Sequence, residues 1–214
     1  MRFSHNLYPG STKRTANVLG MPKYPSINQD GGILFDGDDW TYNTFNADAQ
    51  QFANNWLAAM GAAPGDSIIH FNVQLMGGLL AYLTAQGYNV VDGTTVPFGP
   101  GNYAAYKVLM TPVFIDGPTP QAMIDYVEQG GNVYLQGGMS NGPFTKDDFT
   151  THFGVSYDPL QASVGYSTTP GTGLFAGVTS LYHDNPNALS LVSLQSSIIF
   201  TDGPTTLMAA YNLA

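Results

Sequence analysis

The fold of this chain is decided by residues 106–138, which read YKVLMTPVFIDGPTPQAMIDYVEQGGNVYLQGG. The segment Lys107–Met110 is a short apolar run that stops at Pro112 and is typical of a strand. Thr119 then supplies a helix N-cap, and Pro120 follows at the first helical position, where a missing backbone N–H costs nothing. This order predicts a strand that leads into a helix.

The second half of the same stretch completes a strand–helix–strand unit. Met123, Ile124 and Val127 share one helical face, and the glycine pair 130–131 ends the helix. Residues 132–136 then form a second apolar strand before another pair of glycines. Two strands joined by a helix are parallel and connected by a right-handed crossover. The stretch therefore predicts an α/β fold.

The same alternation of strands and helices starts near residue 31. In chain order, the sequence predicts a strand at 32–35, a helix capped by Asn46 or Asp48, a strand at 67–71, a helix over 75–83 and a strand at 88–91. Alternation of this kind is typical of a mostly parallel sheet with helices on both faces. We expect residues 30–214 to form a single α/β domain of this kind, and residues 1–29, rich in Pro and Gly, to form an extended N-terminal arm.

The chain beyond residue 138 has a different composition. A short helix is expected to start near Thr145 and to lead into a strand around Val155. Residues 157–170 are dominated by Ser, Thr, Gly and Pro, which predicts a long loop or an irregular edge. Two apolar runs, 196–200 and 206–211, flank an Asp-Gly turn and predict a C-terminal β-hairpin.

Over residues 31–142 the chain resembles the class I glutamine-amidotransferase-like group, which has a flavodoxin-like, three-layer fold. The resemblance rests on the strand Val108–Met110, the helix that ends at Gly130-Gly131, and the strand that runs from Val133 into a sharp turn. The family places its catalytic cysteine at that turn, where this chain has Gly137 or Gly138. The resemblance thus implies a degenerate domain without amidotransferase activity, of the kind that serves as a structural or binding module.

Charged residues are only 10% of the 214 residues, against roughly 25% in a typical domain. The polar surface must therefore consist largely of neutral side chains, which offer little charge repulsion between copies. This favours self-association, or an exterior location such as a cell surface or carbohydrate matrix. The chain has no cysteine, which excludes disulfides and a cysteine nucleophile.

The features of the sequence that relate to targeting do not identify the cellular compartment of the protein. No apolar run approaches the ~18 residues of a membrane helix, so we expect no membrane span. The first six residues lack the apolar core of a signal peptide. Export by another route, removal of a leader and a cytoplasmic location all remain open.

The net charge of −9 is distributed unevenly. Residues 1–29 hold four of the six basic residues and no acidic one, a net charge of +4. The rest of the chain holds two basic and fifteen acidic residues, a net charge of −13, which would repel nucleic acid. The N-terminal arm is either a basic tail on an acidic domain or a segment that docks on an acidic surface.

Asp36, Asp38 and Asp39 form the densest group of acidic residues, and Asp92 and Asp116 also follow predicted strands. The carboxyl ends of parallel strands line the usual ligand crevice of an open α/β sheet, and hard oxygen ligands suit Ca²⁺ or Mg²⁺. The first three residues are therefore a candidate calcium site, although the spacing is not that of an EF-hand. The alternative is a set of Asx turns and helix caps.

The sequence matches known catalytic motifs only weakly. Residues 138–142 match the G-x-S-x-G nucleophile elbow with Ser140, but Pro143 delays the helix that should follow at once. A triad would need Asp158 and His183 beside this serine, and nothing in the sequence brings them together. The four histidines (His5, His70, His152 and His183) have no zinc spacing, and no phosphate-binding glycine loop is present, so no cofactor other than a possible calcium ion is expected.

Thirteen tyrosines are unusual for so short a chain, and Tyr157, Tyr166 and Tyr182 lie in its polar C-terminal half. Exposed tyrosines stack on sugars or anchor protein interfaces. The alternative is ordinary packing in the core and at sheet edges.

These observations favour a non-enzymatic structural protein of the cell surface or extracellular space that self-assembles into filaments or rings through its N-terminal arm. The predicted interface residues are Arg2, Phe3, Leu7, Tyr8, Lys13, Arg14, Val18 and Lys23, with the basic ones approaching the aspartate rim of another copy. The alternative is an extracellular hydrolase or carbohydrate-binding module that uses Asp36, Asp38 and Asp39 at the strand ends. Expected partners are other copies of the chain and surface glycans, without nucleic acid.

Overall fold

The computed structural model describes residues 30–73, 76–114, 117–138, 142, 144–161 and 163–213. The eight predicted interface residues in the arm, from Arg2 to Lys23, lie outside this range, as do Asp116 and Ser140. Predictions about their contacts therefore stay predictions.

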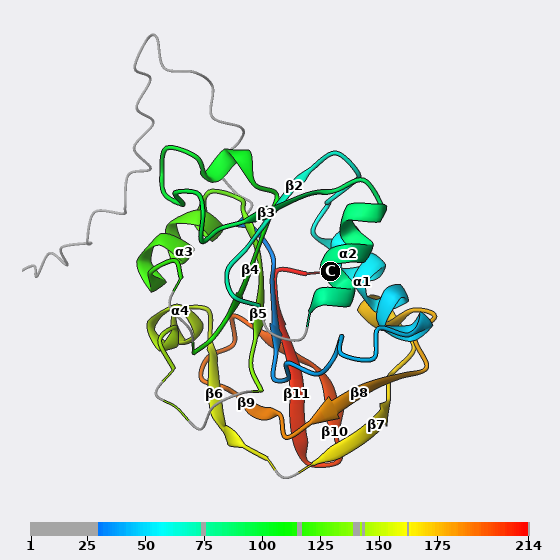
Figure 1. Cartoon of the computed structure of the whole chain (residues 1–214). Coiled ribbons are helices and arrows are strands. Elements are labelled where there is room, and N and C mark those ends of the chain that lie inside the picture. The colour runs from blue at the N-terminus through cyan, green and yellow to red at the C-terminus, as the bar shows by residue number, and fades with distance from the viewer. Residues whose placement is uncertain are drawn as a thin grey trace, which may run out of the picture.

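A mostly parallel sheet forms the centre of the described structure (Figure 1). Its seven strands have the order β10-β11-β1-β5-β4-β2-β3 within the described residues. The bounds are β1 Ile33–Asp36, β2 Ser67–His70, β3 Asn89–Asp92, β4 Val108–Pro112, β5 Asn132–Gln136, β10 Ser197–Asp202 and β11 Thr205–Tyr211. Strands β1 to β5 are mutually parallel, whereas β11 pairs antiparallel with β1. The predicted C-terminal hairpin is confirmed, and it extends the sheet.

Helices cover both faces of this sheet, as predicted (Figure 1). Helices α1 (Ala47–Ala59) and α2 (Gly77–Ala85) pack on one face, and α3 (Pro120–Glu128) and α4 (Asp147–His152) on the other. Every residue of β1, β4 and β5 is buried, because a parallel strand between two helix layers has no solvent face. None of the described helices is long and apolar enough to span a membrane.

The helix starts predicted from the sequence are confirmed. The Asn46 side chain accepts a hydrogen bond from the backbone N–H of Ala49 (3.0 Å) at the start of α1. Thr119 accepts one from Ala122 (3.2 Å) at the start of α3, with Pro120 at its first position. Gly130 ends α3 with a φ of +90°, a backbone conformation that costs glycine little.

The prediction of a loop at 157–170 is wrong. The structure has β6 (Val155–Leu160) paired antiparallel with β9 (Asn187–Leu191), and β7 (Val164–Thr168) paired with β8 (Ser180–Asp184). These hairpins meet the carboxyl end of β1, since Asn187 donates its backbone N–H to Gly37 (2.7 Å). Ser167 is buried where a strand pattern would call for an apolar residue, which hid β7 in a polar composition.

Candidate functional site

The three aspartates that follow β1 lie at the junction between the sheet and the added hairpins. Asp36 ends β1 and is fully buried. The Tyr134 hydroxyl on β5 donates to its Oδ2, and the backbone N–H of Asp38 donates to its Oδ1 (3.0 Å). Burial raises the pKa of Asp36 to about 7, although these hydrogen bonds oppose the rise.

Asp38 is 2% exposed and links β1 to β8. Its Oδ1 accepts the backbone N–H of Trp40 (3.0 Å), and its Oδ2 accepts that of Asp184 (2.8 Å). Burial, and then the charge of Asp36, raise the pKa of Asp38 to about 8. Burial also raises the pKa of Asp39 to about 6, and its Oδ1 has no hydrogen-bond partner among the described residues.

Neighbouring backbone groups complete this junction. The Tyr157 hydroxyl on β6 donates to the carbonyls of Asp36 and Leu135 (both 3.1 Å). The Asn187 side chain accepts the backbone N–H of Gly138 (2.7 Å). The first aspartates of the group thus accept hydrogen bonds from backbone and tyrosine donors, as the Asx-turn interpretation predicts.

The calcium hypothesis stays a prediction. No group of three or more His, Asp or Glu side chains arranged to hold a metal was found within the described ranges. Asp92 lies on β3, which is separated from β1 by β5, β4 and β2, and accepts two hydrogen bonds from Thr94 (2.9 and 2.7 Å). A melting temperature that rises with Ca²⁺ would support a cation at Asp36, Asp38 and Asp39, and one unchanged by Ca²⁺ and by chelator would remove it.

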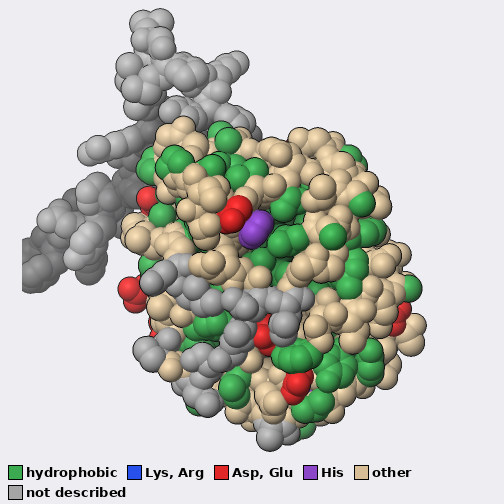
Figure 2. Space-filling model, viewed as in Figure 1, with side chains coloured by type: hydrophobic (Ala, Val, Ile, Leu, Met, Phe, Trp, Pro, Cys, Tyr) green, Lys and Arg blue, Asp and Glu red, His purple; other side chains and the backbone are tan. Residues whose placement is uncertain are grey.

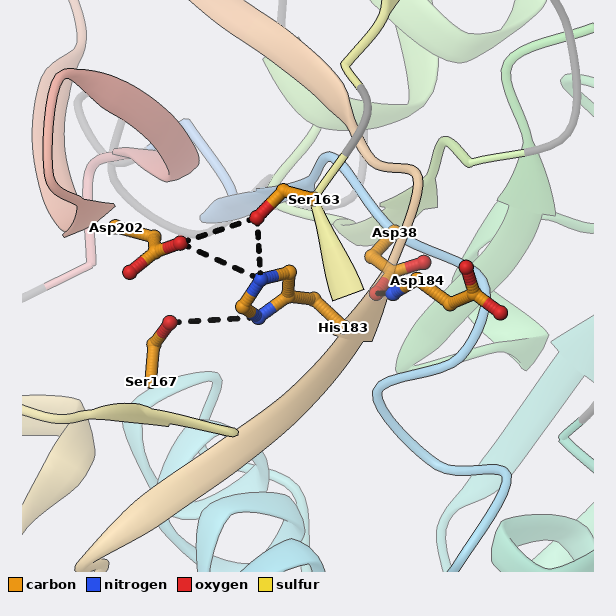
Figure 3. Close-up of polar contacts among 6 residues, drawn as sticks. All are labelled: Asp38, Ser163, Ser167, His183, Asp184 and Asp202. Atoms are coloured by element: carbon orange, nitrogen blue, oxygen red, sulfur yellow. Dashed lines mark hydrogen bonds and ion pairs between the residues drawn. The ribbon is translucent and has the colours of Figure 1, made fainter. Parts of the chain in front are cut away.

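A second polar cluster brings together Ser163, which immediately precedes β7, and Ser167, His183 and Asp202 from β7, β8 and β10 (Figure 3). Ser163 Oγ lies 2.9 Å from His183 Nε2 and 3.1 Å from Asp202 Oδ2. Asp202 Oδ2 lies 3.4 Å from the same Nε2, and Ser167 Oγ lies 3.4 Å from Nδ1. Burial lowers the pKa of His183, against the opposing charges of Asp202 and Asp184.

This cluster does not have the arrangement of a hydrolytic triad. A triad needs the carboxylate on one ring nitrogen and the serine on the other, so that the free lone pair can take the serine proton. Here Ser163 and Asp202 face the same nitrogen of His183. A neutral ring protonated on Nε2 satisfies these contacts, with both serines donating, and leaves no base for Ser163. The cluster therefore joins three strands rather than activating a nucleophile.

The triad considered from the sequence finds no support in the described residues. Asp158 accepts a hydrogen bond from Ser190 (2.6 Å), while His183 faces Asp202. Gly138 has a φ of +93°, and a Cβ there would lie 2.4 Å from the backbone N of Asp39. This backbone has no room for a side chain at 138.

The tyrosines and the histidine that the sequence singled out differ in how exposed they are to solvent. Tyr157 is 4% exposed and belongs to the core, whereas Tyr166 is 55% exposed and Tyr182 is partly exposed. His70 ends β2 beside Asp92 on β3, and its Nδ1 is buried without a partner among the described residues. The sequence did not reveal the contact between His183 and Asp202, because β8, which carries His183, and its partner β7 were not predicted.

Comparison with known proteins does not assign this chain to a family. No protein-family model and no curated protein matches the chain. Among solved structures, the IMPa metallopeptidase from Pseudomonas aeruginosa matches with 14% identity and a TM-score of 0.42. The same metallopeptidase with T-antigen, and IMPa with an O-glycopeptide, match with 15% identity and a TM-score of 0.41. Each match covers 56% of this chain, which spans 15% of the matched chain. Similarity this low carries no argument about function.

Proposed function

We propose that this protein is a non-enzymatic structural protein that self-assembles through its N-terminal segment. The observation that carries the proposal is the separation of charge along the chain. Residues 1–29 carry +4 and the remainder −13. In the described part, Lys107 and Lys146 are the basic residues apart from histidine, and the Lys146 side chain is buried against the Pro118 carbonyl (2.8 Å). Figure 2 shows Asp and Glu side chains on the viewed face and no Lys or Arg among the described residues visible there.

The burial of the aspartates changes where the basic residues could dock. Asp36, Asp38 and Asp39 are at most 2% exposed, so they cannot receive an arm from another copy as the sequence predicted. Among the described acids, several are exposed and Asp184, beside the exposed Tyr166 and Val164 of β7, is partly exposed. Exposed ion pairs contribute only ~0.2–1 kcal/mol each, so charge would orient the contact and buried apolar area would stabilise it.

Reach and apolar surface also support assembly. Extended, 29 residues span up to about 100 Å, whereas a domain of about 185 residues has a radius of gyration of about 16 Å. Val164 and Tyr166, on the same face of β7, are both more than half exposed. Exposed apolar groups of this kind mark contact surfaces when they lie together.

We further propose that the body is a degenerate amidotransferase-like domain with a permuted flavodoxin-like sheet. Counted along the chain, the five parallel strands have the order 3-2-4-5-1. The flavodoxin order is 2-1-3-4-5, and the two coincide when the first strand of this chain is counted last. The sparse charge suits a cell-surface or extracellular location.

Deletion of residues 1–23 tests the proposed function. We expect the full chain to form large assemblies and the truncated chain to be monomeric, as measured by light scattering after size-exclusion chromatography and by negative-stain microscopy. The matched control is Lys107→Gln, which removes one basic residue from the body and should leave assembly intact. A truncated chain that assembles as well as the full chain would refute the proposal.

The alternative is an extracellular hydrolase or carbohydrate-binding module that uses the strand-end aspartates. The burial of those three side chains weakens it, because a substrate needs access to them. A glycan array and an esterase screen address this alternative directly.

A further inference from the structure

An exposed row of aromatic residues lies on the β7–β8 hairpin and the segment that follows β1. The Tyr166 and Tyr182 ring centroids are 5.1 Å apart, and those of Tyr182 and Trp40 are 6.3 Å apart, both edge to face. Val164 extends the row along β7 and is 62% exposed. We call Trp40, Val164, Tyr166 and Tyr182 the aromatic strip.

A partly exposed carboxylate, that of Asp184, lies beside this strip. Asp184 pairs in register with Val164, and its carboxylate points away from His183 (Figure 3). Tyr182 and Asp184 are two residues apart on β8, so their side chains lie on the same face of the strand, whereas Asp38 is buried. No Lys or Arg forms an ion pair with these acids among the described residues.

This combination favours a cationic partner with a planar head. Arginine stacks on tyrosine and tryptophan faces by cation–π attraction and pairs with a carboxylate at the same time. A neutral glycan would use the rings but would gain nothing from the local negative charge. Both arginines of the chain, Arg2 and Arg14, lie in the N-terminal segment.

The position of Asp30 shows at which end of the sheet the described chain begins. Tyr211 and Asn212 donate to Asp30 at the amino end of β1. Trp40 and the aromatic strip lie beyond the carboxyl end of the same strand. A segment that leaves this end of the sheet and docks at the opposite end of a second copy joins the copies head to tail, and such contacts propagate without closing unless the rotation forms a ring.

We propose that the aromatic strip, with Asp184, binds the arginine-bearing segment of residues 1–29 of a second copy. This inference rests on the proposed self-assembly and names its docking surface.

The first experiment is photo-crosslinking in the full chain. A benzophenone amino acid replaces Tyr166, and the protein is assembled as a mixture of ¹⁴N-labelled and ¹⁵N-labelled copies. We expect mixed-isotope crosslinks between position 166 and peptides from residues 1–23. Crosslinks confined to one copy, crosslinks to other segments, or none in assembled material would overturn the inference.

The second experiment compares matched variants of the full chain by sedimentation velocity. Tyr166→Ser removes the ring and should raise the concentration for half-assembly by about tenfold, whereas Tyr166→Phe should leave it near the wild-type value. Asp184→Asn should also weaken assembly, and Asp148→Asn on α4 should not. Leu194→Ser is the control for loss of an exposed apolar group outside the strip.

The outcomes separate this inference from the proposed function. Deletion of residues 1–23 could abolish assembly while Tyr166→Ser and Asp184→Asn both assemble normally. In that case the segment docks on another surface: the aromatic strip is not the docking site, but the proposed function stands. If the deletion itself has no effect, the proposed function fails. Specific glycan binding that is lost in Tyr166→Ser, with assembly unaffected, would identify a sugar as the occupant and overturn the inference.

Discussion

Gly138 is the residue at which β5 gives way to the turn beside the aspartates. Its φ of +93° is accessible to glycine but strained for other residues, and its neighbourhood is closed by the backbone of Asp39. We predict that Gly138→Ala lowers the free energy of unfolding by about 2–4 kcal/mol, measured by urea denaturation.

Gly171→Ala is the matched control for this substitution. Gly171 also has a positive φ (+67°), but nothing lies within 4 Å of a Cβ built there. We expect it to cost about 1 kcal/mol, which isolates the backbone strain from the clash. Equal effects at the two positions would contradict the close approach between Gly138 and Asp39.

The buried carboxyls of Asp36, Asp38 and Asp39 make stability depend on pH. Their pKa values in the folded protein, about 7, 8 and 6, lie above the ordinary value of 3.8. A raised pKa stabilises the fold at low pH, and that stabilisation is lost as pH rises through the folded value. We predict that the free energy of unfolding, measured in urea, falls by several kcal/mol between pH 5 and pH 8.5.

Asp36→Asn removes one of the three titrations and should reduce that difference. Its amide oxygen can still accept the N–H of Asp38, so the variant tests charge rather than geometry. Asp148→Asn, on the exposed first turn of α4, should leave the difference unchanged. A wild-type protein that gains stability toward pH 8.5 would show that other groups dominate the titration.

At the scale of elements, the sequence predicted the features that depend on contacts between residues close together in the chain. Thr119-Pro120 and Asn46 are sufficient to locate helix starts, because a cap is satisfied within three residues. The β7–β8 hairpin could not be read in this way, since its inward-facing Ser167 meets His183, a residue 16 positions away. The buried aspartates were visible as a group, but their burial depends on Tyr134, Tyr157 and the distant β8–β9 turn.

Helix α3 offers a direct test of a capping contact. Thr119→Ala removes the acceptor for the Ala122 N–H and should lower the free energy of unfolding by about 1 kcal/mol, measured by thermal or urea denaturation. Thr119→Ser keeps the hydroxyl and should stay close to the wild type. Loss of stability in both variants would point to the threonine methyl group instead.

At the scale of the whole molecule, folding and assembly are expected to depend on different parts of the chain. Both apolar cores of the described structure are built from residues beyond Gly32. Replacing Arg2, Lys13, Arg14 and Lys23 together by Gln should therefore leave the melting temperature of the monomer within about 1 °C of the wild type. The same variant should assemble poorly at any salt concentration.

Wild-type assembly should weaken between 0.1 and 1 M NaCl, because the Debye length falls from about 10 to about 3 Å. Sedimentation velocity and thermal scans at both concentrations measure the two effects, with Lys107→Gln as control. Wild-type assembly that is insensitive to salt, or a variant that assembles normally, would contradict a charge-directed contact.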